Sequence, residues 1–119
     1  MKIREITDRL SGWSKEQIMA ENELIKLINS VEKRVYDNLI SHRDTEIECK
    51  THNNVDEECM IPDEYADIYV HYILAEHYSR LYESERSAQH GSRFNELYCE
   101  LGNYVVRTFP PKPCAKITI

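Results

Sequence analysis

The sequence predicts a mainly α-helical protein, and three observations support this prediction. Only 3 of the 119 residues are glycine and 4 are proline, so few positions interrupt a helix. Glutamate, leucine, arginine and lysine, which favour helices, are frequent. Apolar side chains recur three and four positions apart along most of the chain. We therefore expect three to four helices in one domain, residues 1–109, followed by an extended C-terminal arm, residues 110–119.

The first two helices are expected at about residues 3–10 and 15–42. In the first, Ile3, Ile6 and Leu10 share one face, and Ser11 and Gly12 end the helix. The second begins with the spacing of a capping box, in which Ser14 and Gln17 satisfy each other's free backbone amides. Its apolar face consists of Leu24, Leu27, Ile28, Val31, Val35 and Leu39.

An acidic segment separates the first two helices from the rest. Between Asp44 and Asp67 there are nine acidic residues and one lysine, Lys50. Residues 45–49 alternate weakly between polar and apolar, and residues 58–61 have the composition of a short strand. We expect a loop or a minor β element at residues 44–61.

Two further helices are expected at about residues 63–81 and 85–107. Pro62 suits a first helical turn, and the helix after it is apolar on more than one side, which is typical of a helix at the centre of a fold or between subunits. Prolines 110, 111 and 113 end the last helix. The apolar stripe of the last helix comprises Phe94, Leu97, Tyr98, Leu101, Tyr104 and Val105.

The charge and hydropathy patterns exclude several classes of protein. The 15 basic and 21 acidic residues give a net charge of −6, which argues against binding to a nucleic-acid backbone. No apolar run is long enough to span a bilayer. Residues 1–12 carry charges throughout and lack the apolar core of a signal peptide. We expect the protein to be made and kept in the cytoplasm, without membrane or sequence-specific nucleic-acid partners.

The sequence contains no recognisable catalytic motif, so we expect no enzymatic activity, cofactor or small-molecule substrate. The strongest metal-site pattern is Cys49-x-x-His52 followed by Cys59, but structural zinc normally takes a second close pair of ligands. We therefore expect no metal site and four free cysteines. Asp67 and His71 are four residues apart on one helix and predict a polar surface pair.

Tyrosines and basic residues predict a subunit interface. Five of the eight tyrosines fall between residues 65 and 82, and tyrosine suits both core edges and interfaces. The end of the chain carries cations without nearby acids, whereas the 44–67 segment is acidic, so copies could pair head to tail and close a ring. The candidate interface residues are Tyr65, Tyr69, Tyr72, Arg107, Lys112 and Lys116.

Several fragments resemble a family of small virion proteins of tailed phages and Firmicute prophages. Residues 61–69 resemble that family's V-P-x-x-Y-D-x-L-Y helix start, and the match extends from about residue 3 to Lys112. The sequence departs from the family pattern at Leu27, at Glu32-Lys33 and at Phe109-Pro110. The other fragments that carry the resemblance are Lys26-Leu27-Ile28-Asn29, Arg34-Val35-Tyr36, Ile40-Ser41-His42, Glu83, Phe94-Asn95, Arg107-Thr108 and Pro111-Lys112.

Members of this family are head–tail connector, adaptor or head-completion proteins. The resemblance implies a helical protomer that joins a ring beneath the portal, contacts portal and tail or neck proteins, and leaves a channel for DNA. It implies neither catalysis nor a cofactor, and it places the assembled protein in the neck of the virion. Two alternatives remain open: a small helical regulatory or interaction protein of a phage or bacterium, and a metal-dependent helical-bundle enzyme.

Overall fold

The computed structural model describes residues 1–13 and 18–112, and within these ranges the protein is mainly helical, as predicted. A π-helical turn, η1 (Tyr36–Ile40), continues the second helix, and a 3-10 turn, η2 (Asp63–Tyr65), precedes the third. The α-helices are α1 (Ile3–Ser11), α2 (Glu21–Val35), α3 (Asp67–Arg80) and α4 (Ser84–Thr108).

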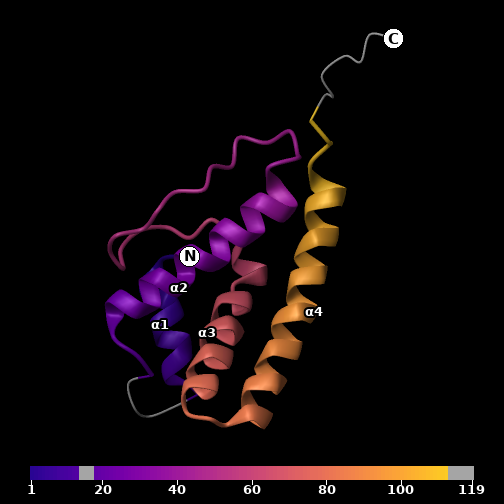
Figure 1. Cartoon of the computed structure of the whole chain (residues 1–119). Helices are drawn as coiled ribbons and strands as arrows, with labels where there is room; N and C mark the ends of the chain where they lie inside the picture. The colour runs from indigo at the N-terminus through magenta and orange to yellow at the C-terminus, as the bar shows by residue number, and fades with distance from the viewer. Residues whose placement is uncertain (14–17, 113–119) are drawn as a thin grey trace.

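Helix α3 lies at the centre of the fold. It pairs with α4 in an antiparallel hairpin, and α1 and α2 pack against it from the other side (Figure 1). The helix is therefore buried on several sides, which explains why its sequence has no single apolar stripe. Its buried residues are Ile68, Tyr69, Val70, His71, Ile73, Leu74 and Tyr78.

The second helix is shorter than residues 15–42. It begins at Glu21, because Ala20 has an extended backbone and the preceding Met19 is buried against the core. The α-helical hydrogen bonding ends at Val35, and the amide of Ser41 then bonds to the carbonyl of Tyr36, five residues back. The capping box predicted at residues 14–17 lies outside the described residues.

The segment between η1 and η2 contains no strand within the described residues. Its backbone instead runs back alongside α2 (Figure 1), held by Asn29, whose side-chain amide bonds to both backbone groups of His52. Isolated antiparallel bridges tie Lys2 to Glu58 and Arg43 to Pro111. Residues 45–50 alternate between half-buried and exposed, so the weak alternation in sequence reflects burial of one side without a partner strand.

The α3–α4 turn forms where it is expected. Tyr82 has a φ of 58°, in the left-handed region that a non-glycine residue adopts rarely, and its side chain is 92% exposed. Helix α4 continues through Gly91 and ends at Thr108.

The first residues of the arm expected at residues 110–119 are hydrogen-bonded to their own chain. The amide of Asp44 donates to the carbonyl of Pro110 over 2.8 Å, and the amide of Lys112 donates to the carbonyl of His42 over 3.0 Å. The chain thus leaves the described fold at Lys112, at the η1 end of the molecule (Figure 1). Residues 113–119, including Lys116 and Cys114, lie outside the described residues.

Candidate functional site

The most elaborate polar arrangement in the described fold surrounds the side chain of Glu32. This carboxylate lies on α2 and is completely buried. Its Oε2 atom accepts hydrogen bonds from the Tyr69 hydroxyl at 2.6 Å and the Met60 amide at 2.7 Å, and its Oε1 atom lies 2.5 Å from Nε2 of His52. One buried acid therefore joins α2, α3 and the segment between them.

The imidazole of His52 lies between two carboxylates. Nε2 faces Glu32, and Nδ1 lies 3.4 Å from Oε1 of Glu57. The other Glu57 oxygen accepts the amides of Asn53 and Asn54 at 2.6 and 2.9 Å, and these bonds lower the pKa of Glu57. Every buried side-chain polar atom in the described ranges has a hydrogen-bond partner, so the buried part of this network is satisfied within the protein.

Tyr69 belongs to this network rather than to a protomer surface. Its hydroxyl donates to Glu32 and accepts the amide of Ile61 at 3.2 Å, and its side chain has no exposed area. Burial and the Glu32 charge raise the pKa of Tyr69, so the phenol stays protonated and can donate. We therefore correct the prediction that Tyr69 contributes to a subunit interface.

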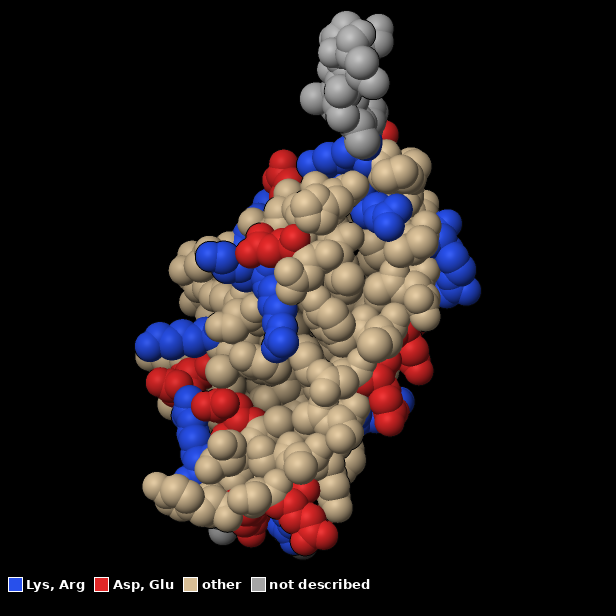
Figure 2. Space-filling view, turned by 45° about the vertical axis from the view of Figure 1, so that its right-hand side comes forward, with Lys and Arg blue, Asp and Glu red and all other residues tan. Residues whose placement is uncertain are grey.

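The other candidate interface residues are accessible where they are described. Tyr65 and Arg107 line the same open depression, together with Val106, which is 57% exposed. Tyr65 packs on Tyr104 with ring centroids 5.3 Å apart, and Lys112 is exposed nearer the end of the chain. Figure 2, which brings the α4 side forward, shows Lys, Arg, Asp and Glu side chains spread over this face with uncharged areas between them.

Tyr72 lies elsewhere on the protein. Its ring packs on Phe94 of α4 with centroids 5.3 Å apart, and it lines a separate depression with Arg34 and Glu76. The structure thus brings Tyr65 and Arg107 together but leaves Tyr72 apart from them.

Asp67 and His71 do not form the predicted pair. Asp67 binds Arg9 of α1 at 2.8 Å, whereas Nδ1 of His71 lies 3.0 Å from Nδ1 of His90 on α4. Trp13 packs edge-on against both imidazole rings at 5.6 and 5.2 Å. Burial is the main cause that lowers the pKa of His71 and of His90, so both rings favour the neutral form.

The three described cysteines are free thiols. Cys49 and Cys59 are half-buried free thiols and Cys99 is an exposed one. His52 of the candidate zinc pattern has its two ring nitrogens directed at carboxylates. Across residues 1–13 and 18–112, no three histidine, cysteine or acidic side chains converge as metal ligands.

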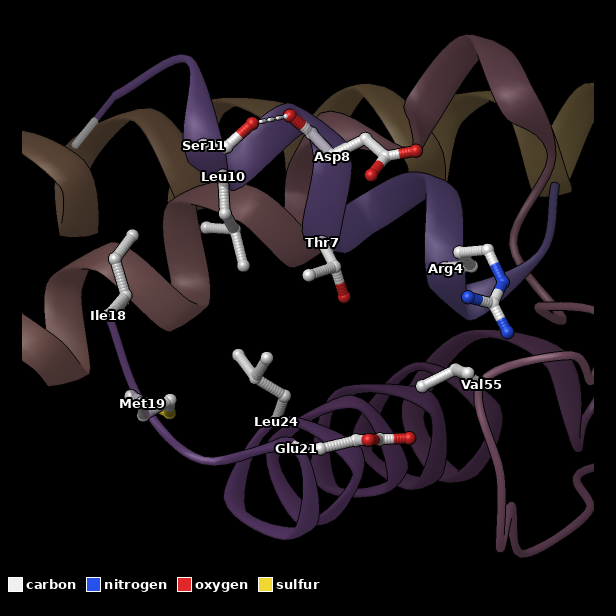
Figure 3. A pocket seen from close by; sticks show the side chains of 10 residues that line it. All are labelled: Arg4, Thr7, Asp8, Leu10, Ser11, Ile18, Met19, Glu21, Leu24 and Val55. Carbon is white, nitrogen blue, oxygen red and sulfur yellow. Dashed lines mark hydrogen bonds between the residues drawn. The ribbon is translucent and has the colours of Figure 1, made fainter. Parts of the chain in front are cut away.

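A pocket of about 310 Å³ lies between α1 and the start of α2 (Figure 3). Leu10 and Thr7 project into it from α1 and Leu24 faces them from α2, with Ile18 beside them. At the opposite side Arg4 lies next to Val55. The lining is completed by Asp8, Ser11, Met19 and Glu21.

Sequence reasoning missed the buried network around Glu32, including the contact of His52 with it, and the Trp13–His71–His90 cluster. In sequence, Glu32 looks like an exposed helical acid, although its positions relative to Ile28, Val31 and Val35 place it near the apolar face of α2. That spacing was the only available signal.

A comparison with protein-family models, curated proteins and solved structures finds no match to this chain. No helix among the described residues is both long and apolar enough to cross a membrane.

Proposed function

We propose that this chain is a structural, non-catalytic subunit of the head–tail connector of a tailed phage or prophage. Copies would form a ring between the portal and the tail, surrounding the path of the DNA. Its partners are other copies of itself, the portal, and tail or neck proteins. The protein is cytoplasmic when synthesised and belongs to the virion neck after assembly.

The observation that carries this proposal is that the fragments behind the family resemblance contact one another in the fold. The guanidinium carbon of Arg34 lies 5.6 Å from the centre of the Phe94 ring, a cation–π distance. The carbonyl of His42 accepts the amide of Lys112. Arg34 and Phe94 are 60 residues apart in sequence, and His42 and Lys112 are 70 apart. Fragments whose order and spacing resemble those of the family therefore also contact one another in the fold, as a shared fold requires.

The helix-start motif at residues 61–69 is equally central. Pro62 precedes the turn that leads into α3, and Tyr69 joins that helix to α2 through Glu32. Residues of this motif thus help to hold the protomer together. Their structural role supports a common architecture rather than a chance similarity of short fragments.

The charge of the protein is compatible with a DNA conduit. A net charge of −6 disfavours tight binding to the phosphate backbone, so DNA could slide through a ring of such subunits without being held.

Deleting the gene from a phage or inducible prophage that carries it tests the proposal. We expect electron microscopy of the lysate to show filled heads and free tails that are not joined. A plasmid-borne intact copy should restore joined particles, and a frameshifted copy serves as the matched control. Antibodies against the protein should label the neck of wild-type virions. Normal virions from the deletion strain, or labelling elsewhere, would refute the proposal and favour a regulatory role.

A further inference from the structure

The pocket between α1 and α2 has an apolar interior with acidic residues in its lining. Leu10, Leu24 and Ile18 supply apolar surface (Figure 3). Of the two acids in the lining, Glu21 lies at the edge of the pocket, whereas the carboxylate of Asp8 points away from the space between Thr7 and Leu24. Among the described residues neither of these two acids lies within ion-pair distance of a cation; Arg4 in the same lining pairs with Asp56 at 2.9 Å, and the charges of Glu21 and Asp8 also act on it. The pocket therefore suits an apolar segment that carries a positive charge.

The chain contains such a segment beyond the described fold. Residues 116–119 read Lys-Ile-Thr-Ile, with one cation directly followed by two isoleucines in alternate positions. In an extended backbone, side chains at alternate positions point to the same side, so Ile117 and Ile119 can enter one apolar depression together. Lys116 would then lie at its edge, near Glu21.

Ile117 cannot reach the pocket of its own chain. Lys112 is held at His42, past the far end of η1, whereas the pocket adjoins Leu24 near the start of α2. The 16 residues from Leu24 to Ile40 cover about 24 Å at about 1.5 Å per residue. Ile117 is five residues beyond Lys112 and can extend at most about 18 Å. On these lengths Ile117 falls short of the pocket of its own chain, so Ile117 and Ile119 can enter it together only on another copy.

We propose that the pocket between α1 and α2 binds residues 116–119 of a second copy of this chain. Because a pocket at one end of the protomer binds a segment from the other end, the contact is heterologous and repeats from copy to copy, which generates a ring when the rotation closes. The inference rests on the proposed connector function for its biological setting, a ring of subunits. The contact itself can be measured in the purified protein without any phage component.

A mixed-disulfide experiment tests the contact. One protein carries Thr7→Cys, which introduces a thiol in the pocket, together with Cys114→Ser, so that its own tail cannot react. The other protein has the original Thr7 and Cys114. After mixing and oxidation with oxidised glutathione, a disulfide between position 7 and Cys114 can form only between two chains. Peptide mapping by mass spectrometry identifies it.

Two matched variants define the result. Ser92→Cys with Cys114→Ser places a thiol on the exposed surface of α4, away from the pocket. We expect at least a tenfold excess of cross-linking at position 7 over position 92. Ile117→Asp in the tail donor, which changes no described residue, should reduce the cross-link at position 7 at least tenfold.

Three outcomes would overturn the proposal: equal cross-linking at both positions, a cross-link that Ile117→Asp leaves unchanged, or no cross-link at position 7 at high protein concentration. These outcomes are independent of the gene-deletion experiment. A specific cross-link with normal virions would refute the connector function alone, and unjoined heads without a specific cross-link would refute the tail–pocket contact alone.

Discussion

The hydroxyl of Tyr69 on α3 donates to the carboxylate of Glu32 on α2 over 2.6 Å, and both side chains are completely buried. The same hydroxyl accepts the amide of Ile61, and the same carboxylate oxygen accepts the amide of Met60. Two side chains thereby satisfy the backbone where the acidic segment enters α3. Removing either partner would leave buried polar groups unsatisfied, which costs more than the net value of one hydrogen bond.

Tyr69→Phe should destabilise the protein by about 1–3 kcal/mol, because the buried amide of Ile61 loses its acceptor and Glu32 loses a donor. Urea unfolding followed by circular dichroism measures the change. Tyr72→Phe is the matched control, since Tyr72 is half-buried and packs on Phe94 through its ring. A change within about 0.5 kcal/mol is expected there. Equal effects of the two substitutions would contradict the role assigned to the Tyr69 hydroxyl.

Glu32→Gln should lower the free energy of unfolding by about 3 kcal/mol. The side-chain NH₂ group of the glutamine would face buried groups that donate to the carboxylate in the wild-type protein. The substitution should also loosen the segment between η1 and η2, which Glu32 binds through His52 and Met60. Limited proteolysis would detect faster cleavage within residues 44–61. Glu48→Gln, at an exposed position of the same segment, should leave stability and cleavage nearly unchanged. Cleavage at the wild-type rate in the Glu32 variant would speak against this account.

The histidine pair predicts a loss of stability in mild acid. Folding lowers the pKa of His71 and of His90 below the ordinary value of 6.5. At a pH between the lowered pKa and the ordinary pKa, the unfolded chain therefore binds more protons than the folded protein. The free energy of unfolding should therefore fall as the pH decreases from about 7 to about 5. Around His71 the Asp67 charge opposes this shift, whereas His90 and Arg93 reinforce it.

Denaturant unfolding at several pH values, followed by fluorescence of Trp13, the sole tryptophan, measures this slope. His90→Gln should flatten it, whereas His42→Gln, at an exposed position, should not. Glu57 affects stability at lower pH, because folding lowers the pKa of its carboxyl group. Its contribution to the free energy of unfolding is lost only as the pH falls below the ordinary pKa of 4.5. A slope that His90→Gln leaves intact would show that another group causes it.

The described thiols should differ in reactivity. Cys99 is exposed and should react first with a disulfide reagent, whereas burial raises the pKa of Cys59 to about 12 and that of Cys49 above its ordinary value. Since the thiolate is the nucleophile, Cys59 should react last. Timed labelling with peptide mapping gives the order. In denaturant all four cysteines should titrate, and elemental analysis should find no stoichiometric metal. Fewer thiols, or about one zinc per chain, would require a different model of the cysteines.

Two truncations separate the tail from the protomer fold. Deleting residues 113–119 should leave helix content and the melting temperature nearly unchanged while abolishing assembly onto heads. Deleting residues 110–119 also removes the bonds of Pro110 and Lys112 to Asp44 and His42, at a cost of about 0.5–1.5 kcal/mol each. Thermal unfolding and in-vitro joining of heads to tails measure the two effects. If the variant that lacks residues 113–119 unfolds, these residues belong to the core of their own chain.

Local sequence patterns were sufficient to predict the helical class and the approximate extent of most elements. In α4, Phe94, Leu97, Leu101 and Val105 recur at the helical period and all four are buried, so the local pattern carried the necessary information. The start of α2 could not be predicted in this way. Met19 is buried against the core although it lies before the helix, at a bend of the chain.

The roles of the polar residues depend on contacts that exist only in the folded protein. Glu32 and Tyr69 are 37 residues apart, and His52 and Met60 come from a segment without regular structure. From sequence alone, a glutamate is predicted to be exposed, because burying a carboxylate costs free energy unless several hydrogen-bond donors converge on it. Such convergence depends on how α2, α3 and the intervening segment pack together. Local periodicity determines helices, whereas the partners of a buried charge are determined by contacts between distant parts of the chain.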